Sequence, residues 1–415
     1  ESSQMEKRAR LPQLDGVRLL AQLWILCAEN LFLGYKPNWM MRPDAAVSLF
    51  ITLSGFVTHW AAADKMGDDA LKATLPFWLR RVSKTAFLFY TAYLLCLALK
   101  WPSLGLFAGS LLFNTEGQPQ DVTDWQFFVS TIPTATMISP WWRGASVRED
   151  YSVNGPSWTV MSLVWCWLLY PISAKMLKRT PDAGLTTVGV AVVALLPYSF
   201  FHCFLPADHY WIVFNWFYEF PPLIFPRFML GAAAAEALRR YKVGDAPLGW
   251  GMVLLPDVLL MAGFIAAALI PWSGGVDPGF GHRAARNGYE FMFDVALCPV
   301  WALVFYLWGL QEVQERPTPQ VLRGPLSKLC RTNVCQRLGR YTWAMYMLRE
   351  PVHLVVILLL SPKMRCGPSE IENCIAFGAD GSAASAYTRQ RPRPGPYSER
   401  TLPWLPTALV ATSTH

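Results

Sequence analysis

The sequence predicts an all-α membrane protein, a polytopic bundle of about nine to ten transmembrane helices. Hydrophobic residues make up 53% of the 415 positions and charged residues only 16%. The mean hydropathy is +0.25, which is too apolar for a soluble globular protein of this length. The apolar residues also gather in runs of bilayer length. Because backbone polar groups in lipid must be paired internally, these runs favour helices.

Apolar segments of about 17 to 25 residues are long enough to cross a bilayer. With a cytoplasmic N terminus, the Lys and Arg clusters between these segments fall on the cytoplasmic side. An odd number of crossings then leaves the C terminus outside. Two shorter apolar stretches, 104–113 and 125–138, are predicted to be re-entrant or interfacial. The predicted spans are 17–34, 45–62, 85–101, 158–174, 185–204, 222–238, 250–271, 290–310 and 342–361.

Composition divides the chain into three parts. Residues 1–13 form an expected cytoplasmic N-terminal segment, residues 14–361 the membrane domain, and residues 362–415 a polar tail. The tail is rich in Gly, Ser, Pro and Arg and cannot bury a core, so we expect it to be disordered. We expect no cleavable signal peptide, because Asp15 and Arg18 precede the first apolar run.

The net charge of +7 comes from short basic clusters between apolar runs. This pattern indicates membrane topology, and no nucleic-acid partner is expected. The chain has nine cysteines. Cys330 and Cys335 lie in a basic loop without the His or second Cys pair that would favour a zinc site. The sequence therefore predicts no metal.

Several stretches resemble the motifs of one family. LDGVRLLAQLWIL (14–26) is similar to the opening LDGLRGIAALLVV, and VSLFITLSGFVTHW (47–60) looks like a second-helix signature that ends in Ser-Gly-Phe. Four further similarities follow in order, in FWLRRVSKTAFLFY (77–90), PSWTVMSLVWCWLLYP (156–171), PRFMLGAAAAEAL (226–238) and LGRYTWAMYMLREPV (338–352). Any single match is weak, but the ordered set resembles the type-three acyltransferases, integral membrane O-acyltransferases.

The resemblance implies a chemistry and its requirements. Members transfer an acyl group, most often acetyl, from acyl-CoA to a hydroxyl of a carbohydrate, lipid or similar acceptor. The attacking hydroxyl needs a base, and the donor phosphates need positive charge. In the family these tasks are attributed to an Arg and a His, spaced Arg-x10-His on the first helix. Arg18 occupies the first position here, and Glu29 stands where the His is expected.

Glu29 has two interpretations. Arg18 and Glu29 are about three helical turns apart and therefore project from the same face. Glu29 is either a replacement base, held in the bundle so that it exchanges a proton near neutral pH, or a vestige that reaches water or pairs with a cation near the outer end of the span.

Two other family positions differ in this chain. Leu163 and Val164 replace a carboxylate pair, and Arg349 stands where the late helix carries a His. His353 follows one turn after Arg349, on nearly the same face. It is a candidate catalytic residue, and the alternative is an ordinary interior histidine.

Arg80, Arg81 and Lys84 form the basic part of the third stretch. They are positive-inside charges, and they are also candidates for binding the phosphates of acyl-CoA at a cytosolic mouth. The two interpretations are compatible. Ser54 has no adjacent base in the sequence, and we interpret the Ser54-Gly55 pair as a site of close helix packing.

The resulting hypothesis is a membrane O-acyltransferase with acyl-CoA as donor co-substrate. The competing hypothesis is a catalytically inactive family member that acts as a membrane binding or interaction protein. A transporter is a third class, but inverted repeats and paired broken helices are not visible in the sequence. Because family members commonly have one more crossing after the last motif, nine spans with an outside C terminus also fit a truncated ten-span bundle.

Overall fold

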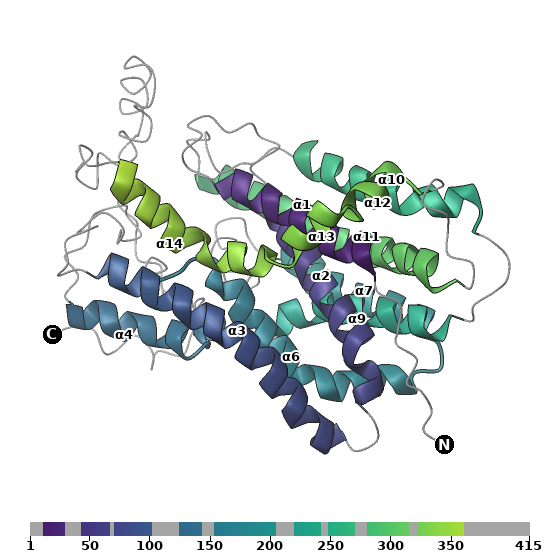
Figure 1. Ribbon diagram of the computed structural model, residues 1–415, viewed down its shortest axis with the longest axis horizontal. Coiled ribbons are helices and arrows are strands. Elements are labelled where there is room, and N and C mark those ends of the chain that lie inside the picture. The colour runs from purple at the N-terminus through teal and green to yellow at the C-terminus, as the bar shows by residue number, and fades with distance from the viewer. Residues whose placement is uncertain are drawn as a thin grey trace, which may run out of the picture.

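The protein is a bundle of helices, seen in a computed structural model (Figure 1). Within the described part of the chain every regular element is a helix and strands are absent, so the all-α prediction is confirmed. In Figure 1, α2 and α9 lie between α3 and α4 on one side and α10 and α12 on the other. The structure describes residues 11–29, 43–66, 70–101, 124–142, 153–204, 220–241, 248–269, 280–314 and 323–360.

The helices follow the apolar runs of the sequence, because each run must pair its own backbone groups in lipid. In chain order they are α1 (Pro12–Glu29), α2 (Pro43–Ala62), the 3-10 turn η3 (Ala63–Lys65), α3 (Ala70–Lys100), α4 (Asp124–Ala135), α5 (Ser139–Trp142), α6 (Ser157–Arg179), α7 (Ala183–Phe204), α9 (Pro221–Arg240), α10 (Trp250–Leu269), α11 (Phe280–Val313), α12 (Pro325–Cys330), α13 (Asn333–Gly339) and α14 (Thr342–Leu360).

Several helices are long and apolar enough to cross a membrane, which supports a multi-pass membrane protein. Among the described residues, five helices meet this condition: Asp44–Lys65, Ala73–Lys100, Ser157–Arg179, Trp250–Leu269 and Val295–Val313. The larger count of nine to ten spans stays a prediction. Helix α4 has only 12 residues, in keeping with the short stretch predicted there, whereas 104–113 lies outside the described residues.

Helix α3 is longer than the sequence predicted. It has 31 residues and begins at Ala70, well before the predicted span 85–101. Hydropathy misplaced this start because Arg80, Arg81 and Lys84 interrupt the apolar run. Arg and Lys are good helix formers, so the charges do not interrupt the helix itself. The three cations therefore lie on a helix and not in a connecting loop.

Helix α9 lies at the centre of the bundle and packs against α2, α6, α7 and α11. Its contact with α2 depends on two glycines. A methyl group added at Gly55 would come within 1.7 Å of the Phe228 carbonyl oxygen, and one at Gly231 within 1.8 Å of the Thr52 oxygen. The two backbones therefore touch directly, which confirms Gly55 as a packing position.

The outer helices present their apolar side chains outward. Phe87 on α3 is 78% exposed, and Leu185 on α7 and Leu269 on α10 are similarly exposed. In a soluble protein such faces would be unstable in water, but a bilayer solvates them. The bundle thus has an interior packed around α2 and α9 and an exterior suited to lipid.

Asp257 on α10 holds the start of the short helix α12. Its Oδ2 atom accepts hydrogen bonds from the backbone N–H groups of Leu326 (2.7 Å) and Ser327 (3.0 Å), and its Oδ1 accepts one from Trp308 Nε1 (3.1 Å). Because Asp257 is only 4% exposed, water cannot replace it easily.

We expect Asp257→Ala to lower the free energy of unfolding by about 2–3 kcal/mol, since it leaves buried donors without an acceptor. The matched control is Asp182→Ala. Asp182 accepts the N–H groups of Gly184 and Leu185 at the start of α7, but in an exposed position. It should cost about 1 kcal/mol or less. Thermal unfolding in detergent measures both, and equal losses would contradict the role of burial.

Candidate active site at one end of the bundle

Two of the predicted site residues, Arg18 and Arg81, interact electrostatically although they lie on different helices. Arg18 on α1 donates from Nη1 to Asp15 Oδ1 at 2.9 Å, and its side chain is 26% exposed. Arg81 on α3 interacts electrostatically with Arg18. Two guanidinium groups in one half-buried region repel each other. An anionic ligand bound between them would be attracted to both guanidinium groups and would offset this repulsion.

Arg81 also contacts aromatic groups of α6. Its guanidinium carbon lies 6.0 Å from the centre of the Trp167 ring, and it interacts electrostatically with Tyr170. Arg80 and Lys84 differ from it, because both side chains are exposed. The Arg80 Nε atom donates to the Pro76 carbonyl of its own helix at 3.0 Å. Of the three predicted phosphate-binding cations, Arg81 is the half-buried one and interacts electrostatically with Arg18.

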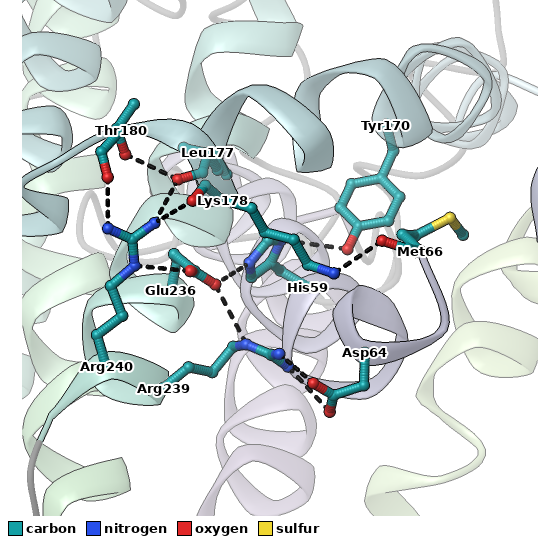
Figure 2. Close-up of polar contacts among 10 residues, drawn as sticks. All are labelled: His59, Asp64, Met66, Tyr170, Leu177, Lys178, Thr180, Glu236, Arg239 and Arg240. Carbon is teal, nitrogen blue, oxygen red and sulfur yellow. Dashed lines mark hydrogen bonds and ion pairs between the residues drawn. The ribbon is translucent and has the colours of Figure 1, made fainter. Parts of the chain in front are cut away.

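A buried histidine joins three helices beside this region (Figure 2). His59 of α2 lies with Nε2 at 2.8 Å from Glu236 Oε2 on α9 and with Nδ1 at 3.1 Å from the Tyr170 hydroxyl on α6. A charged Glu236 accepts from Nε2–H, so Nδ1 accepts the Tyr170 hydroxyl proton; this tautomer follows from the bonding partners. His59 and Tyr170 are both fully buried.

Glu236 also binds two arginines of its own helix. Arg239 Nε lies 3.2 Å from Oε2, and Arg240 Nε lies 2.8 Å from Oε1. Arg239 pairs in addition with Asp64, just after α2. Arg240 donates to the carbonyl oxygens that end α6, at 2.7 Å for Leu177, 3.0 Å for Lys178 and 2.5 Å for Thr180. The cluster in Figure 2 thus fastens the ends of α2, α6 and α9 together.

The chemistry open to this cluster follows from its burial. Both ring nitrogens of His59 are used and the ring has no exposed surface. Glu236 therefore orients the imidazole, and the imidazole in turn holds the Tyr170 hydroxyl in place. The ring does not itself face a substrate. Because Tyr170 interacts electrostatically with Arg81, we interpret His59 and Glu236 as positioning residues for the Arg18 and Arg81 region.

Of the other predicted catalytic residues, the structure describes the side chain of His353 but not that of Glu29. Glu29 ends α1, and its side chain is outside the described residues. His353 on α14 is half-buried, one turn after Glu350, which pairs with Lys100. Lys100 is nineteen residues beyond Arg81 along α3, about 28 Å at 1.5 Å per residue. The structure does not bring His353 to Arg81.

Sequence reasoning missed His59 and Glu236, although both stood within quoted motifs. The available signal was an ionisable side chain within a predicted membrane span, which needs a partner. His59 occurs in 47–60 and Glu236 in 226–238. Their pairing across 177 positions could not be found from the sequence, because it depends on how α2 and α9 cross.

Metal binding has no support among the described residues, where groups of three or more His, Cys, Asp and Glu side chains with suitable geometry are absent. Cys330 and Cys335 are both free thiols. Burial raises the pKa of Cys330 to about 12. Burial therefore disfavours the thiolate, which is the form of cysteine that binds metals.

The fold and this end of the bundle define a class: a polytopic helical membrane protein with a cationic site and a buried histidine–carboxylate cluster among its spans. Comparison with known proteins gives the family. The type-three acyltransferase model, described as "Acyltransferase domain", matches residues 11–367. The chain belongs to this family.

A bacterial relative agrees with this assignment. The chain is 24% identical over 369 residues to Acyltransferase MdmB of Streptomyces mycarofaciens, covering 84% of this chain and 79% of the relative. No solved structure matches the chain significantly.

Proposed function

We propose that the protein transfers an acyl group, most often acetyl, from acyl-CoA to a hydroxyl of a carbohydrate, lipid or similar acceptor. The observation that supports this proposal is the electrostatic interaction of Arg18 and Arg81, which lie on separate helices of the acyltransferase domain. Acyl-CoA carries several phosphate charges, and guanidinium groups bind phosphates through paired, charge-assisted hydrogen bonds.

In the proposed reaction the acceptor oxygen attacks the thioester carbonyl carbon. The carbon–sulfur bond then breaks, and CoA leaves as a thiol after the base passes the proton of the acceptor hydroxyl to the sulfur. The acceptor hydroxyl loses its proton to a base as it attacks. Glu29 remains the proposed base because it shares a face of α1 with Arg18. His353 remains a second candidate, weakened by its position near Glu350.

We further propose that the donor enters from the cytosol. Arg18 lies near the start of α1, whereas Glu236, Arg239 and Arg240 lie near the end of α9. With a cytoplasmic N terminus, these residues belong to the cytoplasmic side of the bundle. Arg80 and Lys84 are exposed there and would attract the anionic donor without enclosing it.

Calorimetry of acetyl-CoA binding to the detergent-purified protein tests the proposal without knowledge of the acceptor. We expect wild-type protein to bind, and Arg18→Ala and Arg81→Ala each to weaken binding about tenfold or more, because each removes a charge-assisted contact. Arg179→Ala is the control, since it removes an exposed positive charge at the end of α6. An equal loss in Arg179→Ala would indicate a nonspecific charge effect and contradict the site.

The competing function is a catalytically inactive family member that binds a partner in the membrane. The observation that favours it is the loss of the family's carboxylate pair, since Leu163 and Val164 are buried apolar side chains. This function predicts stable, folded protein with neither acetyl-CoA binding nor turnover. The same calorimetry, combined with a thermal unfolding measurement, distinguishes the two functions.

A further inference from the structure

Gln22 on α1 is a buried amide without a hydrogen-bond partner in the described part of the chain. Its side chain is 0% exposed, and neither its amide nitrogen nor its amide oxygen is bonded there. Leaving such groups unpaired in a buried position is unfavourable. Buried polar groups in folded proteins are almost always satisfied, so this side chain calls for a partner such as a ligand or a bound water.

Gln22 lies close to Arg18 along α1. It follows Arg18 by four residues, one helical turn, so the two side chains share a face of α1. Arg18 interacts with Arg81, whose guanidinium lies over the Trp167 ring. The indole N–H of Trp167 is also buried and unbonded within the described residues. Three helices thus supply two guanidinium groups and two unpaired polar side chains.

We propose that Gln22 and the Trp167 indole N–H bind the pantetheine arm of the acyl donor, which is the part of CoA that carries amide groups next to the phosphates. This inference rests on the proposed function. A primary amide can both donate to and accept from a secondary amide, and the arm of CoA contains such groups. One helical turn, about 5–6 Å, separates Gln22 from Arg18. This spacing suits a ligand whose amides follow its diphosphate along one chain.

The test compares two ligands by calorimetry on the full-length protein in detergent. One ligand is CoA, and the other is 3′-phosphoadenosine 5′-diphosphate, which has the phosphates but no arm. Gln22→Met keeps the side-chain volume and removes the amide. We expect CoA affinity to fall about three- to tenfold, the loss of one to two hydrogen bonds, with no change for the armless ligand. Trp167→Phe should give the same selective loss.

Thermal unfolding of the ligand-free protein shows whether Gln22 has a structural role, because removing a structural residue would lower the unfolding midpoint. Gln22→Met should leave the midpoint unchanged or raise it, because no internal bond is lost. The matched control is Gln311→Met. Gln311 is equally buried, but its Nε2 donates to the Val253 carbonyl at 3.0 Å. The control should therefore lower the midpoint and leave CoA affinity unchanged.

Two results would overturn the inference while the proposed function stands. The first is a lower midpoint in Gln22→Met with unchanged CoA affinity, which makes Gln22 a structural residue satisfied by water. The second is an equal loss for both ligands, which places Gln22 at the phosphates and not at the arm. If wild-type protein binds neither ligand, the proposed donor is wrong and this inference fails with it.

Discussion

Replacing Gly55 by alanine is expected to prevent α2 and α9 from packing. The added methyl group would lie 1.7 Å from the carbonyl oxygen and 2.7 Å from the carbonyl carbon of Phe228. Both atoms belong to a helix backbone, so no side-chain rotation can relieve the clash. Since α9 is the centre of the bundle, we expect a loss of about 3 kcal/mol or more in the free energy of unfolding.

Gly189→Ala is the control for this prediction. Gly189 also lies within a helix, α7, but a methyl group there would meet nothing within 4 Å. Alanine is a better helix former than glycine, so this variant should gain up to about 1 kcal/mol. Size-exclusion chromatography and thermal unfolding in detergent report both variants. Equal unfolding midpoints would show that the two helices do not touch at Gly55.

Replacing Glu236 by alanine is expected to destabilise the protein, because its hydrogen-bond and ion-pair partners would lose the carboxylate that binds them. The Glu236 side chain is 7% exposed and accepts from His59, Arg239 and Arg240. Removing one member of a buried ionic cluster typically costs about 3–5 kcal/mol, because the remaining charges stay desolvated. We expect a fall of that size in the free energy of unfolding, measured by thermal or denaturant unfolding in detergent.

Asp64→Ala tests whether burial causes this effect. Asp64 pairs with the same Arg239 but is 46% exposed. Exposed ion pairs contribute about 0–1 kcal/mol, so the control should unfold almost like wild type. If Asp64→Ala were as damaging as Glu236→Ala, the stabilisation would come from Arg239 alone and not from the buried carboxylate with His59.

The sequence predicted the helices well because one physical constraint dominates in a bilayer. Each apolar run must satisfy its own backbone, so hydropathy alone indicates where helices such as α2 and α6 lie. The prediction of helix bounds was least accurate where charged residues interrupt an apolar run without interrupting the helix. Arg80, Arg81 and Lys84 delayed the start of the predicted span to residue 85, although α3 begins at Ala70 and continues through them.

The candidate site was only partly predictable. Helical periodicity places Arg18 and Glu29 on one face of α1, and the same periodicity adds Gln22 to that face. The motifs gave three cations on α3, but only the structure separates the half-buried Arg81 from the exposed Arg80 and Lys84. Periodicity describes a single helix, whereas the choice among its faces depends on which neighbour packs against it.

The sequence by itself determined an all-helical membrane protein, its family resemblance and the position of Arg18, because these follow from local hydropathy, local spacing and short motifs. Only the tertiary structure decided that His59 meets Glu236 across 177 positions, and that Arg81 meets Arg18. For His59 and Glu236 the physical reason is the contact of α2 with α9 at Gly55 and Gly231. Direct backbone contact fixes how α2 and α9 cross, and that crossing determines which buried charges become partners.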